Sequence, residues 1–434
     1  MFPKFYEYKL DNGIKVLLIP IKDTKNIATS LTFNIGYLEE TKKQDGIAHL
    51  TEHIISRYIT NHTKIKDIKS NGEYVYTNAN TNHFKTQYHI YSSTKFMNDI
   101  IDSFVKLYDF DRTDRNLFYK EMGAVIVELK QIISDKNKYI MYKNIPEMIF
   151  GKNNILVNDP ISEIKNLKTI TECQLIDFVK QYYKPVNSIL TIVGDFNKSK
   201  TLAYIKSQFN KLDKGIVRPD RIINIPSSKN PKFTFQKTES NLIKLHLSFV
   251  CPNINNDKSN AIILLLKKIL VELNDSSILF KRLRTKLGII YSPKIIRLIN
   301  QYYGLFIINY NIEPNNYNTG LKELIEILNE LKNEKIDDTL LKMAKNKVYY
   351  EILLTQNNLT PKEYLHYSSY LLHKKRDLLN PLEFYNKYTK HITANDIKNW
   401  CKKILTKNNS YLCIIGKDDK VKDFSIKQLK NLDK

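Results

Sequence analysis

An internal repeat constrains the architecture of this 434-residue chain more than any other feature of its sequence. Residues 169–194 align without a gap with residues 391–416, at a constant offset of 416 − 194 = 222, and eight positions are identical between the two segments. Each segment reads as a capped helix, a loop and an apolar strand that ends in glycine. A repeat of this length predicts two homologous domains rather than a solenoid of short units.

The boundary between the two domains is predicted from local composition. The stretch from Lys211 to Pro231 carries Gly215 and three prolines among mixed charges, which is typical of a linker. A chain of this length is also too long for one hydrophobic core. We therefore place a first domain at residues 1–215 and a second at residues 216–434.

The patterns within the domains indicate strands as well as helices. Residues 6–19 read as a β-hairpin, in which Asn12 and Gly13 form a two-residue turn. The alternating apolar residues of the run 27–35 have a counterpart in the run 244–249. We predict an α+β protein with two homologous domains, each a mostly antiparallel β-sheet packed with helices.

The motif His49-x-x-Glu52-His53 is expected to lie on a helix, whose start Asp45 and Gly46 can cap. Two histidines four apart on a helix lie on the same face, and each can present a ring nitrogen to one ion. Glu52 lies on the adjoining strip, where it can take a proton from a water on that ion without being a ligand. The order His-x-x-Glu-His inverts the commoner His-Glu-x-x-His zinc motif. Such residues also occur by chance on a solvated helix, so the motif alone leaves both interpretations open.

A second helix, predicted over residues 113–134 by a strong amphipathic pattern, carries two further acidic residues. Glu121 and Glu128 are seven residues apart, so they lie two turns apart on nearly the same face. Burying an unpaired carboxylate is costly, so two of them on an apolar face indicate a bound cation. The remaining histidines have no ligand spacing, and we assign no function to them. They are His62, His83, His89, His246, His366, His373 and His391.

The chain is strongly basic, with a formal net charge of +23. Such a charge suits an acidic partner such as nucleic acid or anionic lipid. The basic residues are scattered, however, and Lys, Asn, Ile and Tyr are abundant, which is typical of AT-rich coding. We favour coding bias and expect no nucleic-acid partner. The alternative, a basic nucleic-acid-binding module, would be revealed by salt-sensitive duplex binding.

The four cysteines form no Cys-x-x-Cys pair, so neither a disulfide framework nor a cysteine zinc site is indicated. A reducing compartment fits this usage. No apolar run is long enough to span a membrane, and the N-terminus leads almost at once into a strand-like stretch, without the pattern of a signal peptide. We expect a cytoplasmic protein.

The spacing of the acidic and histidine motifs resembles the pitrilysin/insulinase/mitochondrial processing peptidase family of zinc metallopeptidases. In that family a third zinc ligand follows the second histidine by about seventy-five residues, and here 128 − 53 = 75 leads to Glu128. The family glutamate seven residues before the ligand corresponds to Glu121. The resemblance implies that His49, His53 and Glu128 bind one Zn²⁺ per chain. It also implies that Glu52 is the general base and that Glu121 orients a ligand or the motif helix.

Two further segments resemble substrate-binding parts of the same family. Residues 78–81 are similar to an edge strand that holds the substrate backbone, which implies that Asn78 and Ala79 bind peptide. Arg284 and Tyr291 lie in a segment similar to one whose Arg and Tyr contact the substrate carbonyl. They would polarise that carbonyl and stabilise the oxyanion.

The length of the chain resembles that of the half-length members of the family. In the family geometry, the Arg and Tyr reach the zinc from a domain that faces the metal domain across a chamber. Large relatives have four such domains, whereas this chain has room for two. The resemblance therefore implies one half of a clamshell, which pairs as a homodimer or heterodimer to close the chamber. Arg284 and Tyr291 would then act in trans.

The sequence departs from the family pattern at two places. Met122 stands where the family usually has arginine, and residues 55–58 stand near the place of the usual Phe-Lys-Gly-Thr. The second departure affects the loop beside the motif and therefore substrate preference, while the ligand positions are intact.

The sequence as a whole predicts a zinc-dependent endopeptidase that hydrolyses short or unfolded peptides with metal-activated water. Some relatives keep the fold and have lost the zinc residues. The alternative is therefore a non-catalytic scaffold or the partner subunit of a peptidase-like heterodimer.

Overall fold

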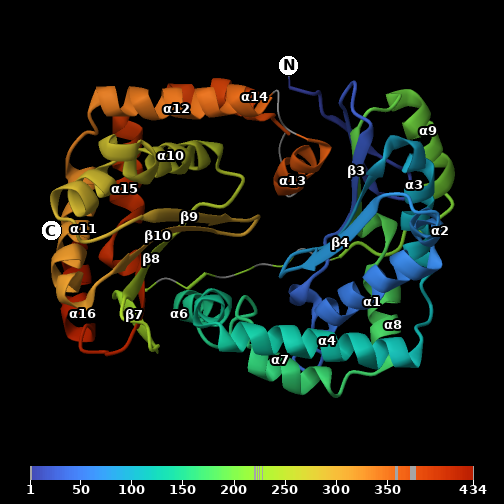
Figure 1. Cartoon of the computed structure of the whole chain (residues 1–434), viewed down its shortest axis with the longest axis horizontal. Coiled ribbons are helices and arrows are strands. Elements are labelled where there is room, and N and C mark those ends of the chain that lie inside the picture. The colour runs from blue at the N-terminus through green and yellow to red at the C-terminus, as the bar shows by residue number, and fades with distance from the viewer. Residues whose placement is uncertain are drawn as a thin grey trace. The chain divides into compact units, whose positions relative to one another are not determined.

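The computed structural model describes residues 2–218, 221, 223, 225–226, 228–356, 360–371 and 378–433. His373 and parts of the predicted linker lie outside the described residues. The chain forms two compact units (Figure 1). The first comprises Met1–Asp135, Asn158–Ile222 and Asn358–Leu372. The second comprises Lys136–Val157, Ile223–Asn357 and His373–Lys434.

A six-stranded sheet forms the centre of the first unit, with the strand order β1-β2-β6-β3-β5-β4. All neighbouring strands are antiparallel except β2 and β6, which are parallel. The strands are β1 (Tyr6–Lys9), β2 (Lys15–Pro20), β3 (Asn26–Phe33), β4 (Val75–Thr81), β5 (Thr86–Ser93) and β6 (Ser188–Gly194). β4 pairs with β5 alone, so its other side is an open edge.

Helices cover both faces of this sheet. They are α1 (Ile47–His62), α2 (Lys64–Ser70), α3 (Met97–Val105), α4 (Arg115–Ser134), α7 (Pro160–Leu167), α8 (Glu172–Tyr182), α9 (Lys198–Phe209) and α13 (Pro361–Leu371). Leu50 and Ile54 of α1 join Leu31, Ile90 and Leu190 of the sheet in one buried apolar cluster. Figure 1 shows α13 beside β3, on the face of the sheet opposite α3 and α9.

The second unit contains a five-stranded sheet with the order β7-β11-β8-β10-β9. Its strands are β7 (Lys232–Lys237), β8 (Ile243–Cys251), β9 (Lys294–Ile299), β10 (Gly304–Ile312) and β11 (Ser410–Gly416). Its helices are α5 (Lys136–Tyr139), α6 (Ile145–Phe150), α10 (Asp257–Lys267), α11 (Tyr317–Asn333), α12 (Asp338–Gln356), α14 (Pro381–Lys387), α15 (Ala394–Ile404) and α16 (Lys422–Leu429). The predicted α+β class, with mostly antiparallel sheets packed with helices, is confirmed.

The two units repeat one topology. In each, one parallel pair (β2 with β6, β7 with β11) is followed across the sheet by three antiparallel neighbours. The helices α8 and α15 and the strands β6 and β11 occupy equivalent ranges at the offset of 222 residues seen in the sequence. The run 27–35 contributes β3 and the run 244–249 lies in β8, which hold the same place in their sheets. α1 and α10 are therefore equivalent helices, as are α4 and α12.

The first hairpin differs from the predicted two-residue turn. The amide of Gly13 donates to the carbonyl of Leu10, and the amide of Leu10 donates to the carbonyl of Ile14. Three residues therefore connect the paired positions, and Gly13 has a φ of +90°, in the left-handed region that glycine tolerates. The Asn-Gly signal located the turn correctly, but a three-residue turn with a left-handed glycine is an equally good solution for such a sequence.

The compact units differ from the predicted contiguous halves in two segments. α13 comes from the second half of the sequence but belongs to the first unit, where Tyr364 contacts Phe2 and Tyr367 contacts Phe5. The segment after α4 belongs to the second unit, where the ring of Phe150 lies 4.8 Å from that of Tyr303. The physical reason is that each segment buries its apolar side chains against the sheet of the unit it joins. In the described parts of the chain, no helix combines the length and apolar character needed to cross a membrane.

Candidate metal centre

The N-terminus of α1 is held by a carboxylate from the preceding loop. The side chain of Glu40 accepts hydrogen bonds from the backbone amides of Gly46 (3.1 Å) and Ala48 (2.8 Å). Gly46 occupies the N-cap position with a φ of +95° and no side-chain cap. Asp45, which we expected to cap the helix, instead forms hydrogen bonds with the side chains of Ser162 and Asn166 in α7. The Glu40 carboxylate fixes the direction in which α1 leaves the loop.

The two motif histidines lie one turn apart on α1, next to each other. Their ring centroids are 5.1 Å apart with an interplanar angle of 75°. His49 is buried, with 7% of its surface exposed, and His53 is half-buried. The opposite side of α1 packs in the apolar core through Leu50, Ile54 and Ile55. Because the apolar side fixes the rotation of the helix, both rings face α4 rather than the sheet core.

α4 brings the third donor to the histidines. One carboxylate oxygen of Glu128, Oε2, lies 3.6 Å from Nε2 of His49 and 3.7 Å from Nε2 of His53. Donor atoms of the three residues all lie within 4.8 Å of one another. Tetrahedral ligands at ordinary Zn–N and Zn–O distances are about 3.4 Å apart. The donor set and its spacing therefore fit a zinc ion, and His49, His53 and Glu128 are the residues that would hold it.

Glu121 of α4 contacts both His53 and the guanidinium group of Arg57, which lie one turn apart on α1. Its carboxylate is buried; Oε2 lies 3.2 Å from Nδ1 of His53, and Oε1 accepts a hydrogen bond of 2.8 Å from Nε of Arg57. A carboxylate on one ring nitrogen sets the tautomer in which the other nitrogen is free to bind a metal. Arg57 lies one turn after His53 and offsets the buried charge of Glu121. The sequence placed Glu121 behind a ligand or the motif helix but gave Arg57 no role.

Glu163 of α7 lies behind His49 as Glu121 lies behind His53. The sequence did not single out Glu163 as a site residue. Its buried carboxylate oxygen Oε1 lies 3.7 Å from Nδ1 of His49. A signal was present. Glu163 stands in an apolar stripe with Pro160, Ile164 and Leu167, the pattern that singled out Glu121. Each histidine thus has one carboxylate behind it and shares Glu128 in front.

The position of Glu52 suits proton transfer. It is 8% exposed and bonds with Thr81 at the end of β4. Burial raises the pKa of Glu52, and the neighbouring His49 and His53 offset part of that rise. A carboxylate with a raised pKa is a stronger base than an ordinary one, and Glu52 lies beside the donor set without belonging to it.

The histidines and carboxylates of the centre shift the pKa values of one another. Burial alone lowers the pKa of His49, but Glu128 and Glu163 outweigh it and raise that pKa to about 10. The same contacts with His49 and His53 hold the pKa of Glu128 well below its usual range. A proton on His49 and a metal ion at its nitrogen are therefore alternatives for balancing the same negative charge.

The residues expected to bind peptide lie on the open edge of the sheet. Asn78 and Ala79 are in β4, and Asn78 is exposed. Thr81, in the same strand, links this edge to Glu52. Arg284 and Tyr291 belong to the second unit. The Arg284 guanidinium lies 4.8 Å from the ring centroid of Tyr291, and Tyr291 is 79% exposed.

The second unit joins its equivalent helices by an ion pair instead of metal donors. The segment 257–272, which comprises α10 and its continuation, contains no histidine. The buried Lys268 at its end lies 2.6 Å from Glu351 of α12. Within the described residues, His49, His53 and Glu128 are the one group of three His, Cys, Asp or Glu side chains whose donor atoms converge.

Comparison with known families also separates a first part of the chain, which contains the donor set, from a second part. A family model described as Insulinase (Peptidase family M16) matches residues 15–156. A second, described as Peptidase M16 inactive domain, matches residues 169–348. The chain belongs to the M16 peptidase family. The first match contains all the converging donors, and the second covers much of the unit in whose described residues no such donor set is found.

Relatives and solved structures named as proteases match between about half of this chain and nearly all of it. An uncharacterized zinc protease of Rickettsia felis is 22% identical over 420 residues, which are 95% of this chain and 97% of that protein. The zinc protease PqqE of Helicobacter pylori is 24% identical over 53% of this chain and 51% of its own length. The crystal structure of an H. pylori protease superposes with a TM-score of 0.81 at 20% identity, covering 96% of this chain and 100% of the other. The periplasmic protease PqqL of Escherichia coli gives a TM-score of 0.83 at 18% identity, over 99% of this chain and 50% of that one. These structural likenesses establish the shared fold.

Replacing Glu163 tests its role behind His49. We expect Glu163→Gln to weaken Zn²⁺ binding about 10- to 100-fold, because the amide no longer fixes the ring by charge. Competition with a chromophoric chelator measures this affinity. Glu7→Gln, an exposed change on β1 at the far edge of the sheet, is the matched control. If Glu163→Gln lowers the stability of the metal-free protein while its zinc affinity equals that of the control, Glu163 is only a packing residue.

Metal binding is expected to release protons. The pKa of His49 is about 10 without metal, so this ring is protonated at neutral pH and must lose its proton to bind Zn²⁺. The pKa of His53 is also raised, because Glu128, Glu52 and Glu121 outweigh the effect of burial. We expect at least one proton to be released per Zn²⁺ bound, and zinc affinity to increase with pH up to the pKa of His49. Calorimetry in buffers of different ionisation enthalpy counts these protons, and a count of zero would contradict the charge arrangement.

Proposed function

We propose that this M16 protein is a zinc-dependent endopeptidase acting on short or unfolded peptides. The observation that carries the proposal is the convergence of His49, His53 and Glu128 beside the buried Glu52. The names of the relatives support zinc-dependent proteolysis at the level of the family.

A zinc ion held by His49, His53 and Glu128 would act as a Lewis acid that makes water nucleophilic at neutral pH and polarises a carbonyl. Three protein donors leave a fourth position open, as catalytic zinc sites require. Glu121, 3.2 Å from Nδ1 of His53, and Glu163, 3.7 Å from Nδ1 of His49, would orient the two rings so that their Nε2 atoms face Glu128. Glu121 is in this sense a positioning residue.

Glu52 is the proposed general base. Its raised pKa lets the carboxylate accept the proton of the attacking water and then donate it to the departing amine of the cleaved bond. Low exposure of the Glu52 carboxylate limits competition from bulk water. The hydrogen bond with Thr81 connects Glu52 to the strand on which the substrate is expected to lie.

The substrate is proposed to bind as an added strand on β4. Backbone hydrogen bonds along Asn78 and Ala79 would hold an extended peptide of any sequence, which suits unfolded chains. Arg284 and Tyr291 are proposed to stabilise the oxyanion through the guanidinium and the hydroxyl. Tyr291 is exposed, and the half-buried Arg284 lies against its ring, so the two side chains are near enough to act on one ligand group.

We propose that two chains form the active enzyme, each supplying Arg284 and Tyr291 to the metal centre of the other. The length relation supports this arrangement, because this chain corresponds to half of the E. coli PqqL chain. The partner is a second copy of this chain or a related subunit. The four cysteines are free, which supports a reducing compartment such as the cytoplasm.

The second candidate is a non-catalytic partner subunit. The match of residues 169–348 to a model described as an inactive domain favours it, as does the likeness to a structure from Pseudomonas fluorescens named for the same domain. The intact donor set of the first unit favours the peptidase. Zinc bound at full occupancy without cleavage of any peptide would decide for the subunit.

The direct test of the peptidase compares wild type with Glu52→Gln, both loaded with zinc, on a mixed pool of unstructured peptides read by mass spectrometry. We expect Glu52→Gln to lose about 10²- to 10⁴-fold in rate while keeping its zinc. Glu7→Gln, with an equal loss of charge on the same unit, should cleave as wild type does. Equal cleavage by wild type and Glu52→Gln would reveal a contaminating protease or a wrong assignment of the base.

The trans arrangement is tested by mixing two inactive variants. Zinc-loaded Glu52→Gln and Arg284→Gln are each expected to cleave poorly, but mixed dimers contain one site with both residues intact. An equimolar mixture should therefore recover about a quarter of wild-type activity, since half of the dimers are mixed and one of their two sites is complete. Recovery should appear only after subunit exchange. An active species that light scattering identifies as a monomer, or a mixture without recovery, would contradict action in trans.

A further inference from the structure

The face of the first unit's sheet that is turned away from α1 carries a set of polar side chains that the metal centre does not use. Successive side chains of a strand point to opposite faces. In β4, Thr81 faces α1, where it bonds with Glu52. Tyr76, Asn78 and Asn80 therefore face the other side, and all three are exposed.

Each of these three side chains has a direct partner on β5, and we call the three pairs the polar ladder. They are Tyr76 with Tyr91, Asn78 with His89, and Asn80 with Gln87. Two further contacts order the ladder: the rings of Tyr76 and Tyr91 stack at 5.5 Å, and Nδ2 of Asn80 lies 3.0 Å from Nε2 of His89. Neighbouring pairs are two residues apart along the strands, which corresponds to about 6.8 Å.

Helix α13 adds basic side chains to two pairs of the ladder. The ammonium group of Lys362 lies 5.5 Å from the ring centroid of Tyr76 and 5.2 Å from that of Tyr91. One turn later, the ring of His366 lies 5.8 Å from the ring of His89. Residues four apart on a helix share a face, so Lys362 and His366 follow the ladder from one pair to the next.

A third basic group lies at the remaining pair. Nζ of Lys85, just before β5, donates a hydrogen bond of 3.1 Å to Oε1 of Gln87. Neither Lys85 nor Lys362 forms an ion pair with a carboxylate anywhere in the described part of the chain. Each pair of the polar ladder is therefore accompanied by one basic side chain.

The positive charge of this face comes from its lysines rather than its histidines, because burial is the main cause that lowers the pKa of both rings and so favours their neutral form. Burial and the nearby His366, Lys85 and Lys362 lower the pKa of His89 to about 3. Burial, Lys362 and Lys85 also lower the pKa of His366, and the carboxylate of Glu363 opposes them. Glu363 is already engaged at the start of α13, where it accepts a hydrogen bond from the amide of Thr360. An anionic group on this face would be attracted by Lys362 and Lys85.

The geometry of strand addition decides where such an anionic group would come from. A peptide added at the open edge of β4 continues the alternation of the sheet. Every second side chain of the peptide would face the ladder, and the intervening ones would face α1 and Glu52. The spacing of ladder-facing side chains in the peptide equals the spacing of the pairs.

We propose that the polar ladder, with Lys362, His366 and Lys85, is a specificity surface that selects peptides carrying acidic side chains at alternate positions. This inference rests on the proposed function, because it takes β4 as the strand that binds substrate. Charge on this face adds sequence preference to a binding mode that otherwise contacts only the backbone. We attributed the basic composition of the chain to coding bias, but at the polar ladder the basic side chains would bind substrate.

The test uses matched peptides in which one glutamate is moved along an otherwise neutral sequence and compared with glutamine at the same position. We expect kcat/KM to rise about fivefold for glutamate at alternate positions on one side of the cleaved bond, as for a partly exposed ion pair. Lys362→Gln should abolish the preference at one of these positions, and Lys362→Arg should retain it. The preference should decline with added salt.

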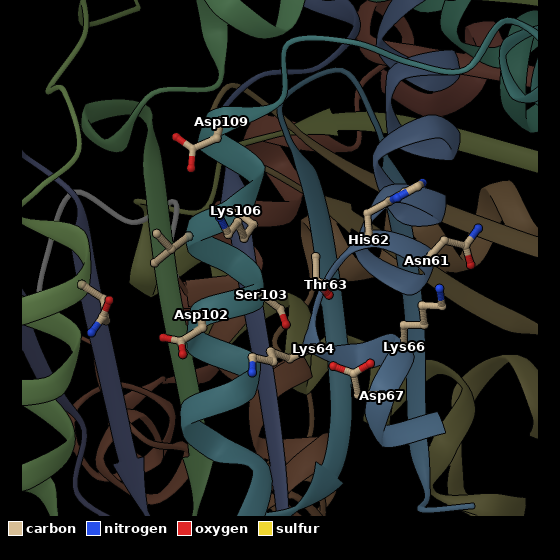
Figure 2. A pocket seen from close by; sticks show the side chains of 12 residues that line it. Asn61, His62, Thr63, Lys64, Lys66, Asp67, Asp102, Ser103, Lys106 and Asp109 are labelled. Carbon is tan, nitrogen blue, oxygen red and sulfur yellow. The ribbon is translucent and has the colours of Figure 1, made fainter. Parts of the chain in front are cut away.

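The control for a general charge effect is Lys66→Gln. Lys66 is an exposed lysine of the same unit and lines a hollow at the end of α1, where Figure 2 shows Lys64, Lys66 and Lys106 among Asp67, Asp102 and Asp109. Lysines and aspartates balance there, in contrast to the ladder. Lys66→Gln should leave the glutamate preference unchanged. An equal loss of preference in Lys66→Gln would assign the effect to net charge and overturn the proposal.

Binding to the zinc-loaded Glu52→Gln variant separates this inference from the proposed function. Fluorescence anisotropy with labelled peptides should show the same alternate-position preference for glutamate without any cleavage. Tighter binding of the acidic peptides, together with no cleavage by wild type, would retain the ladder and reject the peptidase. Cleavage by wild type with no glutamate preference, or a preference without the two-residue period, would reject the ladder and retain the peptidase.

Discussion

Burial of α1 against the six-stranded sheet is the constraint on which the candidate metal centre depends. The apolar side of the helix, with Leu50 and Ile54, joins the core, and this packing turns the motif side towards α4 and α7. His49 and Glu52 are thereby placed where little water reaches them. Buried charged groups need partners, and the two neighbouring helices supply carboxylates in front of the rings and behind them. The same packing that stabilises the unit therefore positions its donors.

The second unit shows which contacts between the two equivalent helices are common to both copies of the fold. Its sheet repeats the order and directions of the first, and its equivalent helices are again joined by charged side chains. There, however, the connection is the ion pair of Lys268 with Glu351 instead of a set of metal donors. A polar link between these helices is thus common to both units, whereas a donor set with an open side occurs in the first. Among the described residues, the second copy of this M16 architecture has no counterpart of the donor set in the first.

The strand β4 lies between Glu52 on one face of the sheet and the polar ladder on the other. Towards α1 its side chains approach Glu52, and towards the other face they form the polar ladder with β5. α13 reaches that second face from the far half of the chain, because its apolar residues are buried there. A peptide on this edge would therefore meet chemistry on one side and charge recognition on the other. The alternation of strand side chains separates the two tasks.

The sequence by itself determined the α+β class, the duplicated topology and the family, because these depend on local periodicity and on spacing along the chain. It also singled out His49, Glu52, His53 and Glu128, whose positions on two predicted helices leave few ways to combine them. The predicted length of the first hairpin turn was wrong, because an Asn-Gly pair suits more than one type of turn. The roles of Arg57 and Glu163, the exchange of α13 and the polar ladder were decided by the tertiary structure alone. They depend on contacts between residues far apart in the sequence, and which buried charge meets which partner is fixed only when the helices pack.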